Sequence, residues 1–295
     1  MRVVVSGAGG PIGAALTDLL ESQGDHVVRL TRGDPGSDMI TWDPDAGRID
    51  AAGLEGADAV VHLAAEPIAP PLTKGKRERV LGSRSKGTRL LALTLAGLDQ
   101  KPNVLLSASA IGFYGNRGNE TLTETSTAGT GFLSEVVLQW EAATRPAEEA
   151  GIRVVHARTG LVLTSRGGAL SRLLIPFRLG LGGRLGSGRQ WWSWISLTDE
   201  VRAMAYCIET EELSGAVNLT SPSPVTNAEF TKQLGAVLRR PSAIAVPATA
   251  LRLALGSDLA EGLVLASARV MPERLLQTGF SFRHEQLDEA LAAEL

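Results

Sequence analysis

Residues 3–13 read Val-Val-Val-Ser-Gly-Ala-Gly-Gly-Pro-Ile-Gly, and this stretch decides the fold. Residues 3–6 form a short apolar run that predicts a buried parallel strand, and the apolar spacing from residue 12 to residue 20 is helical. A turn that merely needs small residues would carry similar glycines. A glycine loop between a first strand and a first helix is nevertheless typical of dinucleotide binding.

Each glycine of this loop has a physical role in such a site. Gly7 permits the tight turn, Gly10 lets the backbone approach a pyrophosphate, and Gly13 lets helix and strand pack closely. The amino terminus of the helix then offers unpaired N–H groups and the positive end of its dipole to the phosphates. We expect the cofactor to contact Gly7, Gly10, Pro11, Ile12 and Gly13.

The end of the second predicted strand, residues 26–31, indicates which dinucleotide is bound. Enzymes that use NAD usually carry an acidic residue there, which binds the ribose 2′-hydroxyl. This chain has Arg29-Leu30-Thr31-Arg32 instead. A guanidinium suits a 2′-phosphate, so we expect NADP, held by Thr31 and Arg32. The alternative, a solvated surface arginine, stays open because Asp34 is close in sequence.

Strands alternate with helices over the first half of the chain. Further strands are predicted at residues 39–42, 57–64, 103–109 and 153–158, and helices at 76–98 and 132–150. This rhythm predicts an α/β fold, a Rossmann-type doubly wound parallel sheet covered on both faces.

The rhythm breaks after residue 158. Residues 180–188 are glycine-rich and predict a flexible loop or hairpin, and Pro241 and Pro247 frame a short predicted strand. Helices are predicted at 198–210 and 227–238, a strand at 216–219, and mainly helix thereafter. We expect an NADP-binding domain over residues 1–165, to which 198–220 return. A smaller, mainly helical substrate-side region would comprise 166–197 and 221–295, with residues 227–295 over the carboxyl ends of the strands.

Composition excludes several classes of protein. The 295 residues include 29 Lys and Arg against 32 Asp and Glu, so the net charge of −3 offers no overall basic field for nucleic acid or an anionic membrane. No apolar run reaches the roughly 18 residues of a membrane span, and the amino terminus does not resemble a signal peptide. With a single cysteine, Cys207, and four isolated histidines, we expect a cytoplasmic protein without a metal site.

Several short stretches occur in order along almost the whole chain. They are Leu63-Ala64-Ala65-Glu66-Pro67-Ile68, Gly82-Ser83-Arg84, Ser107-Ala108-Ser109-Ala110-Ile111-Gly112-Phe113-Tyr114-Gly115, Trp140-Glu141, Ser193-Trp194-Ile195, Asn218-Leu219-Thr220 and Gly279-Phe280. Together they resemble the extended short-chain dehydrogenase/reductases, the group that includes nucleotide-sugar epimerases. More closely, the chain is similar to an atypical subfamily called epimerase family proteins, which carry a small carboxy-terminal domain of unknown function.

The resemblance implies places for further cofactor contacts. Leu63 and Ala64 would border the cofactor ribose, and Arg84 would lie near the cofactor. Residues 158–162, Val162 included, would lie beside the nicotinamide. Ser107 and Ser109 would face the nicotinamide from the end of a strand. The list of implied contacts is therefore Leu63, Ala64, Arg84, Ser107 and Val162.

The usual catalytic pair of that superfamily is missing. Ordinary members carry Tyr-x-x-x-Lys, in which the tyrosine exchanges a proton with the substrate and the lysine lowers the tyrosine's pKa. Neither Tyr114 nor Tyr206 has a lysine four residues later. If Glu141 aligns with the acidic residue that often follows the motif, Leu133 and Val137 occupy the two catalytic positions.

Three residues are candidate substitutes for that pair. Ser109 could orient a carbonyl group, or it could be a turn residue at the end of a strand. Tyr114 could be the acid, or it could be structural. Glu124 could act as a base, or it could be a charge beside a helix.

Two functions therefore stay open. The first is an NADP-dependent oxidoreductase or epimerase that acts on a small polar substrate, such as a nucleotide sugar, through a non-standard proton donor. The second is a regulatory protein that senses NADP(H) and performs no chemistry. Trp192 and Trp194 alternate onto one face of a predicted strand and could stack on a planar ligand, although core packing explains Trp194 more simply.

Overall fold

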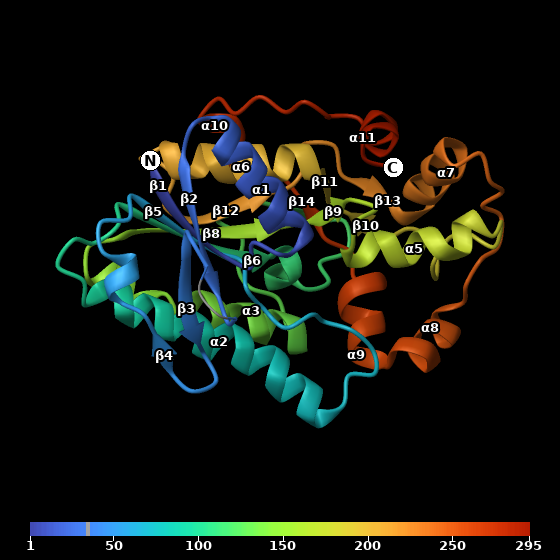
Figure 1. The fold of residues 1–295 in the computed structure, drawn as a ribbon. Coiled ribbons are helices and arrows are strands. Elements are labelled where there is room, and N and C mark those ends of the chain that lie inside the picture. Colours follow the sequence, from blue (N-terminus) through green and yellow to red (C-terminus); the bar gives the residue numbers. More distant parts are fainter. Residues whose placement is uncertain (34–35) are drawn as a thin grey trace.

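One large sheet organises the fold (Figure 1). The computed structural model describes residues 1–33 and 36–295, so Asp34 lies outside the described residues. The sheet has the strand order β12-β8-β6-β5-β1-β2-β3-β4. Its strands are β1 (Arg2–Ser6), β2 (His26–Thr31), β3 (Met39–Asp43), β4 (Arg48–Ile49), β5 (Ala59–His62), β6 (Val104–Ala110), β8 (Arg153–Thr159) and β12 (Gly215–Leu219). Every pair is parallel except β3 with β4, which confirms the predicted doubly wound fold.

Helices cover both faces of this sheet. The helices α1 (Pro11–Ser22) and α6 (Leu197–Glu209) lie on one face, and α2 (Lys74–Ala96), α3 (Phe132–Ala142) and α4 (Arg145–Glu149) lie on the other (Figure 1). Successive side chains of a strand point to opposite faces. In β1, Val3 and Val5 therefore enter the core under α1 and α6, whereas Val4 enters the core under α2. Because both faces are buried, the middle residues of the central strands β1 and β5 are apolar.

The remaining elements extend beyond the large sheet. They are β7 (Thr121–Leu122), β9 (Leu161–Leu163), β10 (Trp191–Trp192), β11 (Trp194–Ser196), β13 (Val225–Thr226), β14 (Arg269–Val270), α5 (Gly168–Arg178), α7 (Asn227–Val237), α8 (Ala248–Leu255), α9 (Ser257–Leu259), α10 (Glu273–Gln277) and α11 (Leu287–Glu294). Short 3-10 turns occupy Ala52–Leu54 and Ile111–Tyr114, and a π turn occupies Ala260–Val264. Among the described residues, no helix combines the length and the apolar character needed to cross a membrane.

A third apolar cluster lies beyond the carboxyl ends of the strands, where β9 continues from β8. It joins α5, α7 and α11 around the fully buried Trp194. Of residues 227–295, which were expected over the carboxyl ends of the strands, α7 and α11 belong to this cluster. The helix α10 runs instead along the sheet edge, where Arg274 donates to the carbonyl oxygens of Glu212 and Ala216, both at 3.0 Å.

The structure corrects three local predictions. The single helix predicted over residues 132–150 is two helices, because Pro146 cannot donate a backbone hydrogen bond and its ring blocks the preceding turn. The strand predicted between Pro241 and Pro247 is reduced to one bridge, between Leu185 and Val246. The helix α5 was not predicted.

Candidate cofactor site

The glycine loop joins β1 to α1 at the point where the strand order reverses, which is where open α/β sheets bind ligands. Gly7 has φ +74°, and a Cβ there would lie 2.8 Å from the backbone nitrogen of Ala64. A Cβ on Gly13 would fall far inside van der Waals contact with the carbonyl oxygen of Gly7. A Cβ on Gly10 would meet only that same oxygen, at 3.4 Å, so its other side is open. The loop therefore packs tightly at Gly7 and Gly13 and leaves the side of Gly10 open to a ligand.

The helix α1 begins at the edge of the same opening, at Gly10. Gly10 is the N-cap residue, and no side chain caps the helix. Pro11 occupies the first helical position, where its missing N–H costs nothing. The N–H groups that follow are donors without an intrahelical partner, and they suit a diphosphate.

A cleft of about 820 Å³ opens from this loop. Its walls come from the glycine loop, the end of β2, the segment after β5 and one face of α2. It brings together Gly7, Gly10, Thr31, Arg32, Leu63 and Ala64 among the predicted cofactor contacts. Sequence reasoning missed Trp42, Arg79, Ser83 and Lys86, which also line the cleft. The expected contacts that do not line it are Pro11, Ile12, Gly13, Arg84, Ser107 and Val162.

The segment after β5 is held in place by a buried pair, Ser6 and His62. The Ser6 hydroxyl accepts from the backbone nitrogens of Leu63 at 3.1 Å and Ala64 at 3.3 Å. The Ser6 hydroxyl in turn donates a hydrogen bond to His62 Nδ1, 2.7 Å away. Burial lowers the pKa of His62 to about 4, so the ring is neutral. The sequence did not predict this role of Ser6 and His62, because a polar side chain at the end of a strand can point toward the ligand or toward a neighbouring strand.

Arg84 supports the same segment from α2 instead of facing the cleft. Its side chain is 8% exposed and donates to the carbonyl oxygen of Glu66 at 2.9 Å. The guanidinium lies 4.9 Å from the ring centre of Trp140. Burial lowers the pKa of Arg84 to about 10. The side chain of Glu66 pairs with Lys76, which ties the segment to α2 a second time.

The candidate serine lies in a buried network at the ends of β6 and β8. Ser109 donates to Glu141 Oε1 at 2.6 Å, and Arg158 binds both oxygens of Glu141 at 2.8 Å. Burial alone would raise the pKa of Glu141, but the hydrogen bonds and charge of Arg158 hold it below its usual value. The Arg158 guanidinium also lies 3.4 Å from the ring centre of Phe113. Ser109 is therefore engaged with a carboxylate and is 4% exposed.

Tyr114 continues this network into the last strand of the sheet. Its hydroxyl accepts from Arg158 at 3.1 Å and donates to Asn218 Oδ1 at 2.7 Å. The side chain is fully buried. Burial raises the pKa of Tyr114 above its usual value, so the hydroxyl keeps its proton.

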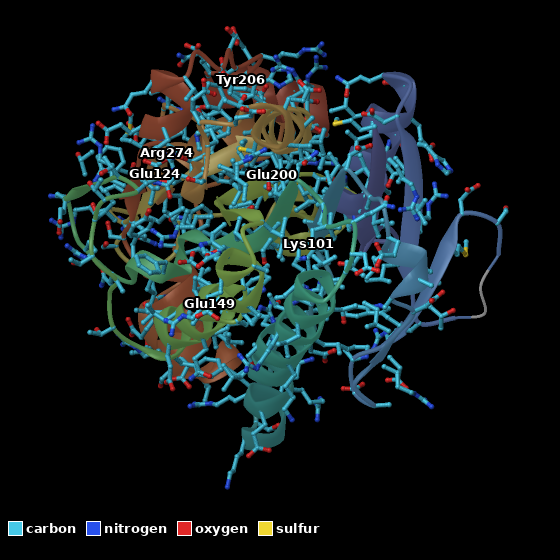
Figure 2. All side chains as sticks on the ribbon, turned by 90° about the vertical axis from the view of Figure 1, so that its left-hand side faces the viewer. Lys101, Glu124, Glu149, Glu200, Tyr206 and Arg274 are labelled. Carbon is cyan, nitrogen blue, oxygen red and sulfur yellow. The ribbon has the colours of Figure 1, made fainter. Side chains whose placement is uncertain are left out.

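Glu124 lies at the far end of the same network. One carboxylate oxygen accepts from the backbone nitrogens of Asn218 at 3.0 Å and Arg274 at 3.4 Å, and Figure 2 shows Glu124 and Arg274 side by side. Burial raises the pKa of Glu124 above its usual value. The three candidate acid/base residues, Ser109, Tyr114 and Glu124, are thus linked to one another and none lines the cleft.

Leu133 and Val137, which would occupy the Tyr-Lys positions if Glu141 aligns as expected, are apolar and buried. Leu133 is 7% exposed, and Val137 packs with Phe113 and Val270 in a local core. The tryptophans are also engaged: Trp192 packs edge-on against Phe230. Within residues 1–33 and 36–295, no group of three or more His, Cys, Asp or Glu side chains is placed to hold a metal ion.

Comparisons with known proteins agree with this geometry. Residues 3–219 match the model of the NAD dependent epimerase/dehydratase family, and residues 246–294 match the domain of unknown function DUF1731. An epimerase family protein of Mycobacterium bovis is 44% identical over 291 residues, which cover 98% of this chain and 96% of that protein. The human epimerase family protein SDR39U1 is 38% identical over 295 residues, which cover 99% of this chain and 98% of that protein.

Two solved structures are similar over the whole chain. The crystal structure of human SDR39U1 with NADPH has a TM-score of 0.92 at 36% identity and covers 100% of this chain and 99% of that one. A nucleoside-diphosphate sugar epimerase from Corynebacterium glutamicum has a TM-score of 0.83 at 37% identity, and covers 100% of this chain but 58% of that one. The family resemblance inferred from the sequence motifs is confirmed.

Proposed function

The chain belongs to the NAD dependent epimerase/dehydratase family, and on this premise we propose that its cleft binds NADP(H). The shape of the glycine loop supports a diphosphate there, because Gly7 and Gly13 let the loop pack tightly against its neighbours while Gly10 stays open to the cleft. The NADPH in the similar human structure supports the choice of cofactor. Bound NADPH would supply a hydride at its nicotinamide ring.

The chain's own residues then have separate roles in binding. The first turn of α1 would hold the diphosphate, and Arg32, with Thr31 beside it, would hold the 2′-phosphate. Leu63 and Ala64 would border the adenosine ribose, held in place by the Ser6–His62 pair. We assign this binding to residues 1–165 with 198–220, and the cover on the substrate side to residues 166–197 and 221–295.

We further propose that the protein senses NADP(H) without carrying out proton-coupled hydride transfer. The observation that carries this proposal is the engagement of Ser109, Tyr114 and Glu124 in one hydrogen-bond network, in which Ser109 and Tyr114 are buried and Glu124 is partly buried. A general acid must reach the reacting oxygen at hydrogen-bond distance. The hydroxyls of Ser109 and Tyr114 already donate elsewhere, one oxygen of Glu124 accepts from two backbone nitrogens, and its other oxygen, which has no partner among the described residues, is buried. Leu133 and Val137 cannot transfer a proton. A carbonyl substrate would therefore find no donor.

A second candidate function is an oxidoreductase or epimerase that acts on nucleotide sugars. The similarity to the nucleoside-diphosphate sugar epimerase from Corynebacterium glutamicum supports it. It requires Ser109 to leave Glu141 and turn toward the substrate.

One experiment separates the two. NADPH is titrated by tryptophan fluorescence, and NADPH absorbance is then followed with generic carbonyl compounds and common UDP-sugars, while sugar products are analysed by chromatography. We expect binding but no turnover above the protein-free rate. Turnover that is lost in Ser109→Ala would establish the second function, and turnover that survives in Ser109→Ala would reject both the sensing function and the serine assignment. Failure to bind NADPH would overturn the proposal as a whole.

A further inference from the structure

The net charge of −3 conceals an uneven distribution along the chain. Residues 165–198 and 230–257 together contain nine Arg and Lys and no Asp or Glu. The rest of the chain contains 20 Arg and Lys against 32 Asp and Glu. Such asymmetry points to an anionic partner for the basic part. The basic segments include α5, α7 from residue 230 onward and α8, and these helices lie together at the right-hand end of the molecule in Figure 1.

Exposed aliphatic side chains gather within these basic segments. Ile175 is 61% exposed, Leu179 69%, Leu181 56% and Ile244 47%. We call these four residues the α5 patch. Side chains this exposed protrude from the surface, whereas residues that line a groove are largely covered.

Backbone contacts hold the members of the α5 patch together. Ile175 and Leu179 are one helical turn apart at the end of α5. The backbone nitrogen of Ile244 donates to the carbonyl oxygen of Gly182 at 3.3 Å, beside Leu181. The backbone nitrogen of Val246 donates to that of Arg184 at 2.9 Å. The two segments therefore form one surface.

Arginines border this surface and project into solvent. They are Arg172, Arg178, Arg184, Arg239 and Arg240, all exposed. None of the five forms an ion pair with another described residue. Their charges are thus available to a partner.

We propose that the α5 patch and its arginines dock the protein on the surface of an anionic lipid bilayer. Aliphatic side chains that protrude between cations match the headgroup boundary, where the chains enter the apolar layer and the guanidinium groups stay with phosphates. Nucleic acid would use the arginines but gain little from exposed Ile and Leu. A helical or extended peptide would need a groove. The net charge of −3 indicated no anionic membrane partner, but that number sums over the whole chain and hides the basic segments.

The test is cosedimentation of the full chain with vesicles of phosphatidylcholine, with and without phosphatidylglycerol. We expect binding to the vesicles that contain phosphatidylglycerol, weakened by salt, and little binding to phosphatidylcholine alone. Leu179→Ser combined with Leu181→Ser should weaken binding about tenfold or more, because apolar surface no longer enters the bilayer. Arg172→Gln combined with Arg178→Gln should weaken it about 25-fold, since each cation near an anionic surface contributes about fivefold.

Matched controls come from elements outside the basic segments. Leu93→Ser with Leu138→Ser removes two exposed leucines of α2 and α3, and Arg48→Gln removes an exposed cation of β4. These controls should bind vesicles like the wild type, and all variants should unfold at the wild-type temperature and keep the wild-type affinity for NADPH.

Three results would overturn the proposal. The first is no binding to either kind of vesicle. The second is equal loss of binding in the α5-patch variants and the controls. The third is a concentration-dependent dimer in light scattering that the Leu179→Ser, Leu181→Ser variant abolishes, which would assign the patch to a second copy of the chain.

Discussion

Glu200→Gln should stabilise the protein progressively as the pH rises. Glu200 lies in the first turn of α6, fully buried inside the molecule (Figure 2). One carboxylate oxygen accepts from the Thr159 hydroxyl at 2.7 Å, and the other has no partner among the described residues. Burial raises the pKa of Glu200 from 4.5 to about 8, although the hydrogen bond from Thr159 opposes this shift. The folded protein therefore holds this side chain as a neutral acid.

The magnitude follows from proton linkage. Below pH 4.5 both the folded and the unfolded chain carry the proton, so the stability from this group is fully present. Between pH 4.5 and about 8 only the folded chain keeps it. The free energy of unfolding then falls by about 1.4 kcal/mol per pH unit, or roughly 5 kcal/mol over the window. Glutamine has the same shape and no titrating proton. The free energy of unfolding of Glu200→Gln therefore does not fall in this way as the pH rises.

The assay is urea unfolding of both proteins at pH values below, inside and above this window. The difference in unfolding free energy should grow with pH and level off above pH 8. His62, with its pKa lowered by burial to about 4, destabilises both proteins equally in acid and cancels from the difference. Glu209→Gln, an exposed change in the same helix, should give a curve parallel to the wild type. A difference that does not vary with pH would refute the neutral, buried state of Glu200.

Two further substitutions test the loop and the network. Gly13→Ala should weaken NADPH binding by about tenfold or more in a fluorescence titration, because the added methyl group forces α1 away from the loop; Gly97→Ala, at the end of α2 and outside the cleft, where a Cβ makes only ordinary contacts, should bind normally, and equal affinities of the two variants would contradict this role of Gly13. Tyr114→Phe should lower the free energy of unfolding by about 1–3 kcal/mol, because Arg158 loses a buried acceptor; unchanged stability in denaturant titration would show that the hydroxyl is not structural.

The cofactor cleft could be predicted in outline because its signals are local. Gly7 and Gly13 are needed for backbone contacts within a few residues, and Arg32 follows directly after a strand whose apolar run is visible in the sequence. Arg84 was expected near the cofactor, but it does not line the cleft. Its actual contact, the carbonyl oxygen of Glu66, depends on how a helix packs on a loop, which its neighbours in sequence do not reveal.

The network around the candidate acids could not be predicted for the same reason. The hydrogen bond from Tyr114 to Asn218 joins residues 104 positions apart, and that from Asn218 to Glu124 joins residues 94 apart. The sequence shows a serine, a tyrosine and a glutamate at suitable places, but only packing determines that they bind other residues of the protein, among them Glu141 and Asn218, instead of a ligand. The break in the helix at Pro146 was visible in principle, since proline ends or kinks a helix.

The most direct test of the account is the affinity of Arg32→Ala for NADP and for NAD, titrated by tryptophan fluorescence at one salt concentration. Arg32 lines the cleft and is exposed, so it can reach a 2′-phosphate, which NAD lacks. A hydrogen bond to a charged group corresponds to about ten- to a hundredfold in affinity, and an exposed site favours the lower figure. We predict that wild type prefers NADP and that Arg32→Ala loses about tenfold for NADP while NAD binding is unchanged. Equal losses for both cofactors, or a wild-type preference for NAD, would contradict the assignment of Arg32 to the 2′-phosphate of NADP.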